Sequence, residues 1–418
     1  MLKNFVAMFR REFSGYNGGK FIKDLLAGLT VAAVALPLAL AFGVASGADA
    51  AAGLVTAIVA GVVISAFSGA SFQISGPTGA MAAILGAIVA QYSLQGVFTV
   101  CFMAGVILLI CGIFRVGKLV SFIPAPVITG FTSGIAVIIA LGQIDNFFGT
   151  HSEGESAIDK LVSYGEFGFT PDIFTVLIGL LVVVVMLVYP KKWNAKVPSS
   201  LVGIIIATIV CVIVGADKFA TIGEIPKTLF LEQRFSLAQL DPKTMVALIS
   251  PAFSVAALGM IESLLCGASA SRMKDEPFDA NIELLAQGAG NILIPFFGGV
   301  PATAAIARTS VAIKSGAQTR LTGIFHALWL IAAMFLLGDI MALIPNAALA
   351  GVLMVTAWRM NEWHEIKAMF GGKRIGAILL FLITMVATVV FDLVVAIVIG
   401  VACSLVFRFI FKDLKKKA

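Results

Sequence analysis

Several long stretches of this chain contain no ionised side chain, and they constrain the fold more than any other feature. Three clear examples are Ile173–Tyr189, Ile375–Phe391 and Leu393–Phe407. A helix needs roughly 17–25 mostly apolar residues to cross the hydrocarbon core of a bilayer. Each stretch lies near that length, so the sequence predicts helices that span a membrane.

Composition extends this prediction to the whole chain. Of the 418 residues, 60% are hydrophobic and 12% are charged, and the mean hydropathy is +1.03, whereas soluble domains carry about 25% charged residues. A soluble fold is therefore excluded, and we predict an all-α polytopic membrane protein. The first residues carry scattered Lys and Arg but no short apolar core with a cleavage site, so we expect no signal peptide.

The basic residues follow membrane topology. With fourteen spans and a cytoplasmic amino terminus, only five of the 29 Lys and Arg fall in the two segments placed outside, residues 145–172 and 216–244. This asymmetry is the positive-inside rule, which predicts a plasma-membrane protein with both termini cytoplasmic and a basic cytoplasmic tail at residues 412–418. Because these residues form no single basic stripe, the net charge of +6 does not indicate nucleic-acid binding.

Two segments interrupt the apolar helices in the same way. They are FSGASFQISGPTGAMAAILGAIV (Phe67–Val89) and FGGVPATAAIARTSVAIKSGA (Phe297–Ala317). In each, an extended stretch containing Gly and Pro leads into a helix too short to cross alone. Such irregular backbone is tolerated at membrane depth only where protein or a water-filled cavity surrounds it. The sequence therefore predicts short half-helices at the third and tenth spans.

A second repeated sequence pattern supports an internal duplication. An Ile-Pro pair with a Gly six residues beyond the Pro occurs at residues 123–130 and again at 344–351. Seven spans in the first half would invert the second half, so we predict two inverted repeats, residues 1–215 and 245–411. This architecture is typical of secondary transporters, which bind substrate near the midplane between half-helices. Helix packing explains a single glycine-rich break equally well, but two corresponding breaks favour the transporter interpretation.

Two ionised residues are expected deep in the membrane, where each costs at least roughly 2.5–3.5 kcal/mol. Glu262 lies on a helix with a face of small residues, and Arg308 lies at the head of the second short helix. Thr78, with the backbone N–H groups of Gly79 and Ala80, forms the head of the first. Together the two helix heads predict an anion cradle. The alternative is that Glu262 and Arg308 form only a structural salt bridge.

Other positions support weaker predictions. Phe42 follows the Pro37 kink of the first span and is either plain packing or a wall of the site. A polar stripe on one predicted helix is best explained by capping and interhelical hydrogen bonds; its members are Asn281, Glu283, Gln287 and Asn291. The five Cys lie in apolar stretches without a C-x-x-C pair, and the three His are far apart, so we expect no metal and no cofactor.

Several segments together resemble the sulfate permease (SulP) family, whose animal relatives include anion exchangers and the motor protein prestin. They are DLLAGLTVAAVALPLALAFGVASG (Asp24–Gly47), ISGPTGA (Ile74–Ala80), NIELLAQGAGNI (Asn281–Ile292), GGVPATAAIARTSVAIKSGAQTRLTG (Gly298–Gly323) and FDLVVAIVIGV (Phe391–Val401). The resemblance covers almost the whole chain and is far more specific than any single glycine pattern.

The resemblance implies a fourteen-span fold in which a core domain, spans one to four and eight to eleven, moves against a gate domain like an elevator, usually as a dimer. It places the anion between the third and tenth spans, beside the first-span aromatic. The substrate-binding residues implied are Phe42, Thr78, Gly79, Ala80, Ala305, Ile306, Ala307 and Arg308. Glu262 stands where sodium-using relatives have Asp and relatives thought to use protons have Glu, which implies proton coupling rather than sodium coupling.

Family members usually carry a cytoplasmic STAS domain after the last span, whereas this sequence ends at Ala418. We therefore expect a membrane domain only, residues 1–418.

We hypothesise a proton-coupled secondary transporter of small inorganic anions, namely sulfate, bicarbonate or chloride. The alternatives are a dicarboxylate transporter of the same family, and a passive anion channel or charge-sensing motor. A nucleobase symporter would carry a carboxylate at the tenth-span head, where this chain has Arg308. An enzyme is not expected, because the chain has no H-E-x-x-H pair and no G-x-S-x-G elbow. The expected partners are the anion, a proton, membrane lipid and a second copy of the chain.

Overall fold

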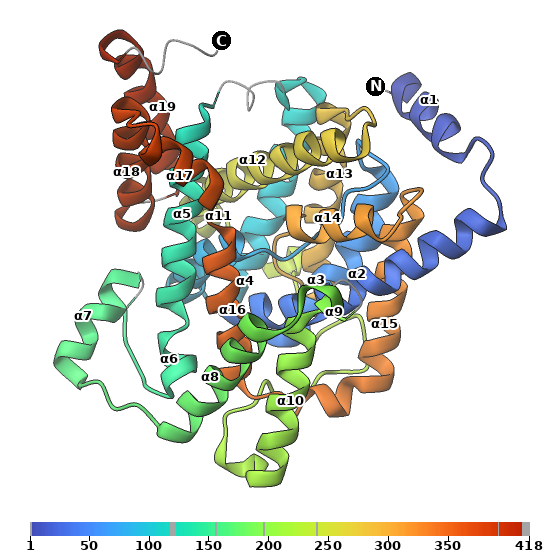
Figure 1. Cartoon of the computed structure of the whole chain (residues 1–418). Coiled ribbons are helices and arrows are strands. Elements are labelled where there is room, and N and C mark those ends of the chain that lie inside the picture. Colours follow the sequence, from blue (N-terminus) through green and yellow to red (C-terminus); the bar gives the residue numbers. More distant parts are fainter. Residues whose placement is uncertain are drawn as a thin grey trace.

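The computed structural model describes residues 2–117, 123–154, 157–194, 197–239, 241–391 and 393–411. The predicted basic tail, residues 412–418, lies outside the described residues. Within them, helices form nearly all the regular structure. Figure 1 shows α1 (Leu2–Phe13) and α19 (Leu393–Ile410) at one end of the molecule and α10 (Ser199–Val214) at the other.

The remaining helices of the first half are α2 (Gly18–Ala45), α3 (Ala50–Phe67), α4 (Gly79–Ile113), α5 (Ala125–Gly142), α6 (Ile144–Phe148), α7 (Ala157–Phe167), α8 (Ile173–Val188) and α9 (Lys191–Asn194). Those of the second half are α11 (Pro242–Ala247), α12 (Ile249–Lys274), α13 (Ala280–Leu293), α14 (Ile306–Lys314), α15 (Leu321–Met341), α16 (Asn346–Met360), α17 (Trp363–Gly371) and α18 (Ile375–Val390). Short 3-10 helices lie in the connections, among them Ala216–Lys218, Leu237–Gln239 and Ile294–Phe297.

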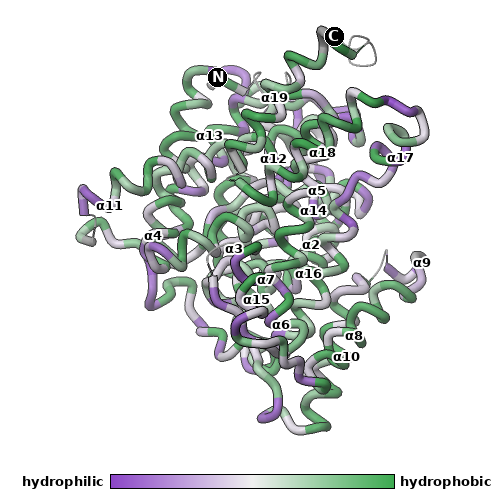
Figure 2. Tube along the Cα trace, turned by 90° about the vertical axis from the view of Figure 1, so that its left-hand side faces the viewer, coloured by the Kyte–Doolittle hydropathy of each residue, from purple (hydrophilic) through white to green (hydrophobic). Residues whose placement is uncertain are grey.

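Six of these helices are long and apolar enough to cross a membrane: α2, α3, α4, α5, α12 and α15. Four shorter apolar helices accompany them, at Ile173–Val188, Ser199–Val214, Ile375–Val390 and Val395–Phe407. Apolar residues dominate the whole helical body (Figure 2). The prediction of a multi-span helical membrane protein is therefore confirmed, while the count of fourteen spans stays a prediction.

Small residues let the first two spans cross at very short range. A Cβ built on Gly53 of α3 would lie 2.0 Å from the carbonyl oxygen of Ala39 in α2, and one built on Gly43 would lie 2.8 Å from the backbone nitrogen of Gly53. Because any side chain at these positions would push the helices apart, glycine is required for the crossing.

The helices pack in two groups. In the first, α2 packs on α3, α15 packs on both, and α12 and α13 pack on α4. In the second, α18 packs on α5 and α19, and α8 packs on α10 and α16. Contacts of α4 with α5, and of α2 with α16 and α10, join the groups.

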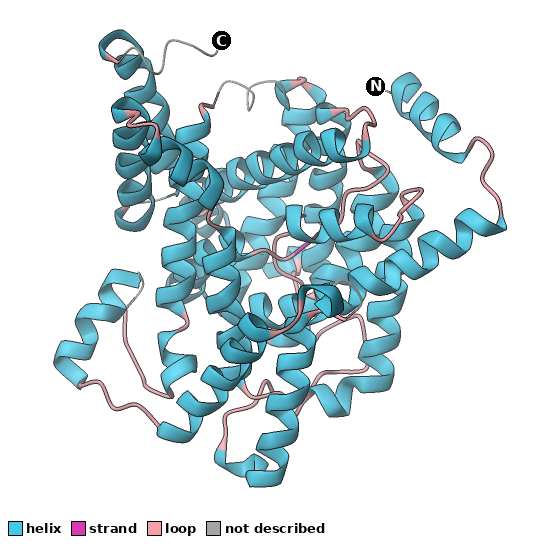
Figure 3. Ribbon diagram, viewed as in Figure 1, coloured by secondary structure: helices cyan, strands magenta, loops and turns pink. Residues whose placement is uncertain are grey.

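A two-stranded antiparallel sheet lies near the centre of the first group, where the ribbon is magenta in Figure 3. Strand β1 (Ser75–Gly76) pairs with β2 (Thr303–Ala304), with Ser75 opposite Ala304 and Gly76 opposite Thr303. The sequence predicted an extended stretch at each break but not that the two breaks hydrogen-bond to each other. Pairing satisfies backbone groups that hydrocarbon would leave unpaired.

Candidate functional site

The two breaks carry the starts of two helices at opposite ends of the short strand pair. Thr78 is the N-cap of α4, and its side chain accepts a hydrogen bond from the backbone N–H of Met81. Ala305 is the N-cap of α14, its N–H donates to the carbonyl oxygen of Ile74, and no side chain caps this helix. The strand pairing thus carries both helix starts, as the anion-cradle prediction requires.

Both helices are short at this point. The helix α14 has nine residues, and α4 is interrupted at Ser93, whose φ of 60° is not helical. The first part of α4 therefore runs only from Gly79 to Tyr92. A half-helix presents its amino-terminal N–H groups and its dipole inside the protein rather than at the membrane surface.

Arg308 is the charged group of the site. Only 1% of it is exposed, and its Nη2 donates to the carbonyl oxygen of Pro77. Its Nε and Nη1 have no hydrogen-bond partner among the described residues. A Cβ built on Gly76 would lie 2.3 Å from Nη1, so the glycine makes room for the guanidinium. One side of the guanidinium therefore holds the first break, and two nitrogens remain available to a ligand.

Glu262 joins the two breaks through their threonines. Its carboxylate accepts hydrogen bonds from the hydroxyls of Thr78, at 2.9 Å, and Thr303, at 2.7 Å. The ion pairs found in the described part of the chain do not include Glu262 with Arg308. The alternative of a direct structural salt bridge is therefore wrong for this conformation, in which the two threonine hydroxyls both donate to Oε2 of Glu262.

Phe42 lies beside the same helix start. It is 5% exposed, and a Cβ built on Gly79 would lie 3.1 Å from its ring. Phe42 also lines a cavity of about 160 Å³ with Ala82 of α4 and Ile139 of α5. The aromatic ring thus separates the head of α4 from this cavity, which the polar site residues do not line.

The other residues predicted for the site differ in how exposed their side chains are. Ala80 is fully buried, whereas Ile306 is 50% exposed and Ala307 is exposed. Since the side chains of Ile306 and Ala307 face away from the buried guanidinium, only their backbone N–H groups fit a site at this helix start.

The polar stripe on α13 supports both breaks, which confirms the expectation of interhelical hydrogen bonds. Gln287 donates to the hydroxyl of Ser75 in β1. Asn291 donates to the carbonyl oxygen of Ala302 and accepts from its N–H, just before β2. These residues lie one helical turn apart, so a single face of α13 holds both strands in place.

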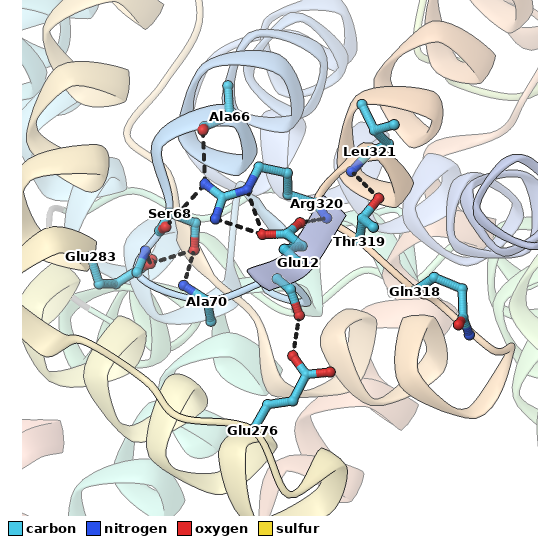
Figure 4. Close-up of polar contacts among 12 residues, drawn as sticks. Glu12, Ala66, Ser68, Ala70, Glu276, Glu283, Gln318, Thr319, Arg320 and Leu321 are labelled. Atoms are coloured by element: carbon cyan, nitrogen blue, oxygen red, sulfur yellow. Dashed lines mark hydrogen bonds and ion pairs between the residues drawn. The ribbon is translucent and has the colours of Figure 1, made fainter. Parts of the chain in front are cut away.

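A further network, missed from the sequence, anchors the start of the first break (Figure 4). Glu283 of α13 accepts hydrogen bonds from the hydroxyl of Ser68 and the N–H of Gly69. Arg320 donates to the carbonyl oxygen of Ser68 and pairs with Glu12 of α1 at 2.7 Å. The side chains of this pair are 2% and 5% exposed. Thr303 and Pro77 were also missed, although both lie within the two breaks singled out from the sequence.

No group of three or more His, Cys, Asp or Glu side chains in the described ranges is arranged to hold a metal ion.

Comparisons with known proteins agree with this geometry. The chain matches the description "Sulfate permease family" over residues 21–384. The chain belongs to the sulfate permease family. A relative in Bacillus subtilis, "Putative sulfate transporter YvdB", is 40% identical over 416 residues, covering 96% of this chain and 76% of the relative. The sulfate permease assignment makes the protein a membrane transporter rather than an enzyme.

Two solved structures share the fold. "The transmembrane domain of a cyanobacterium bicarbonate transporter BicA" aligns with a TM-score of 0.84 and 30% identity, covering 91% of this chain and 98% of that one. The murine anion transporter Slc26a9, solved in an inward-facing state, aligns with a TM-score of 0.83 at 17% identity, covering 95% of this chain and 70% of that one. The second likeness concerns the fold alone.

Proposed function

We propose that this protein is a secondary active transporter of small inorganic anions, coupled to protons and working by elevator-type alternating access. The observation that carries the proposal is the buried Arg308, with Nη2 bound to Pro77 and with Nε and Nη1 unpartnered. Each of these two nitrogens shares an edge of the planar guanidinium with Nη2, so an oxyanion can accept two parallel hydrogen bonds, one from the second N–H of Nη2 and one from Nε or Nη1. The helix starts at Gly79 and Ile306 add the positive ends of two dipoles.

The anions proposed are sulfate, bicarbonate and chloride. YvdB is described as a putative sulfate transporter and BicA as a bicarbonate transporter, and both resemble this chain over most of its length. A single guanidinium with helix amino termini accepts either an oxyanion or a halide, so the geometry supports this substrate class as a whole.

Glu262 is the proposed coupling residue. It is hydrogen-bonded to Thr78 and Thr303, so its charge lies between the two helix starts. An ionised Glu262 would repel an anion and offset the positive charge of Arg308, and protonation removes both effects. Proton and anion would therefore bind together and cross together.

The moving core in this proposal is the first packing group, α2, α3, α4 and α12 to α15. The strand pairing, the α13 stripe and the hydrogen bonds between Thr56 of α3 and Val300 tie both breaks into one body. The gate would be α5, α8, α10, α16, α18 and α19. Counting the two parts of α4 separately gives fourteen spans, seven in each proposed inverted repeat, residues 1–215 and 245–411.

The proposal also includes the orientation of the termini, the membrane in which the protein lies and its oligomeric state. The distribution of Lys and Arg supports two cytoplasmic termini in this proposal, and the membrane proposed is the plasma membrane. The family resemblance favours a homodimer, which crosslinking in native membranes would detect.

The decisive test of the function is uptake into proteoliposomes. Purified protein is offered labelled sulfate, bicarbonate, chloride and a dicarboxylate, with pH and sodium gradients imposed separately. Accumulation of an inorganic anion driven by an inward proton gradient is expected. Currents far above carrier turnover would indicate a channel, and sodium-driven uptake would refute proton coupling.

Coupling is tested separately by Glu262→Gln, which mimics the protonated carboxyl permanently. The variant should exchange anion for anion but lose the response to a pH gradient. Glu283→Gln is the matched control, because it changes another buried carboxylate of the same body and should keep that response. Uptake by Glu262→Gln that still follows the pH gradient would falsify the coupling role.

A further inference from the structure

One face of α3 lies behind the Arg308 guanidinium. Ala57, Gly61 and Ser65 lie on it, each one helical turn from the next, and α3 itself carries no titratable side chain. His326 of α15 is fully buried, and no side chain among the described residues hydrogen-bonds to its ring nitrogens. The Ser65 hydroxyl is likewise buried and unpartnered among them.

The glycine contacts locate His326 relative to Arg308. A Cβ built on Gly76 would lie 2.3 Å from Nη1 of Arg308 and 3.4 Å from the Cα of Ala57. A Cβ built on Gly61 would lie 3.2 Å from Nδ1 of His326. Ala57 and Gly61 are four residues, or about 6 Å along the axis, apart on one helix, so Arg308 and His326 approach the same face of α3 at successive turns.

Few other charges face this imidazole. The helix α3 offers none, α14 offers Arg308, and α2 offers Asp24, which accepts a hydrogen bond from Thr322 one turn before His326. On α15 itself the other charged residue is Asp339, at the far end and paired with Lys227. The N-cap of α15, Arg320, lies within two turns of His326 and is paired with Glu12. The charges around His326 are therefore Arg308, the Asp24 carboxylate and this ion pair.

An imidazole at this depth without a side-chain partner calls for an explanation. Ionisable residues inside a membrane mark ion or proton pathways by default. Histidine is also the side chain whose charge changes most readily near neutral pH. These features suit a residue that gains a proton during the transport cycle.

We propose that His326 is a proton-binding site that takes up a proton when a doubly charged anion occupies the site before Arg308. This inference rests on the proposed function. When Glu262 is protonated, the positive charge of Arg308 neutralises a singly charged anion. A doubly charged anion would leave one negative charge without a counter-charge in a low-dielectric interior. A proton on His326 balances that charge. Sulfate would then cross with two protons, one on Glu262 and one on His326, without net charge.

The test is isothermal titration calorimetry of the purified protein with sulfate and with chloride. Each titration is run in two amine buffers of different ionisation enthalpy, which gives the number of protons taken up per bound anion. Sulfate stays doubly charged between pH 6 and 8 in solution, so any pH dependence belongs to the protein. Wild type should take up about one proton more with sulfate than with chloride, and per pH unit its sulfate affinity should fall up to about tenfold more steeply than its chloride affinity.

The variants then assign the proton. His326→Gln should lose the excess proton uptake and flatten the pH dependence, whereas Glu262→Gln should keep the excess. His364→Gln changes an exposed histidine of α17 and should match wild type. His326→Asn replaces His326→Gln if the latter does not fold.

Two outcomes overturn the inference. One is equal proton uptake with sulfate and chloride in wild type, a measurement that needs no variant. The other is an unchanged excess in a folded His326 variant. Failure of wild type to bind any anion at any pH would instead overturn the proposed function, and this inference with it.

Discussion

Arg308 offers the sharpest test of the proposed anion site. Its guanidinium has one nitrogen bound to Pro77, while Nε and Nη1 are unpartnered in the described structure. Arg308→Ala removes both available nitrogens and the charge. Arg308→Lys keeps the charge but replaces the planar fork with a single ammonium group. The two variants therefore separate charge from geometry.

The expected magnitudes follow from those two nitrogens. A hydrogen bond to a charged group contributes about 1.5–3 kcal/mol, so losing two weakens binding by about 3–6 kcal/mol, or roughly 10²- to 10⁴-fold in Kd. The lysine variant retains one such bond and should lose about half of that free energy, roughly 10- to 150-fold. Oxyanions such as sulfate should show a larger difference between the two variants than chloride, which cannot use two parallel bonds.

Calorimetry in detergent measures these affinities, and Arg320→Lys is the matched control. Arg320 is also buried, at 3% exposure, but Glu12 and backbone carbonyl oxygens occupy its donors. This variant should melt at a lower temperature without losing anion affinity. Wild-type Kd in both Arg308 variants would remove Arg308 from the site. A parallel loss in Arg320→Lys would show that the effect is structural rather than local.

Thermal and denaturant unfolding in detergent check three further predictions. Glu12→Gln leaves the buried Arg320 without its counter-charge and should cost about 3–5 kcal/mol; a melting temperature equal to wild type contradicts this. Asn291→Leu leaves the N–H and carbonyl of Ala302 unpaired, at about 1–3 kcal/mol each, and should also lower transport; unchanged stability would argue against the α13 support. Gly53→Ala forces apart two crossing helices and should cost about 1–3 kcal/mol, and a neutral effect would refute the close crossing.

Much of the site could be predicted because the rules involved are local. Proline and glycine in an apolar context indicate a broken helix, and a charged residue at such a break requires a buried partner. These rules located Thr78, Gly79 and Arg308. They also indicated the polar stripe on α13, since hydrogen-bonding side chains at helical spacing rarely face lipid.

Local sequence rules could not predict contacts between distant segments or the exposure of some site residues. Nothing in the sequence showed that the hydroxyls of Thr78 and Thr303, 225 residues apart, would bind the Glu262 carboxylate in place of Arg308. The pairing of Glu12 with Arg320 joins residues 308 apart. The exposure of Ile306 depends on which face of α14 packs inward, and the nine-residue helix gives too short a pattern to predict it.

The sequence by itself determined that this protein crosses a membrane many times, where its helices break, and to which family it belongs. The physical reason is that a bilayer penalises every ionised or unpaired group, so few arrangements satisfy such an apolar chain. Tertiary structure alone decided how the breaks meet. Strand pairing between β1 and β2, the approach of Arg308 to Gly76, and the hydrogen bond of Arg308 to Pro77 all depend on three-dimensional packing between segments more than 200 residues apart.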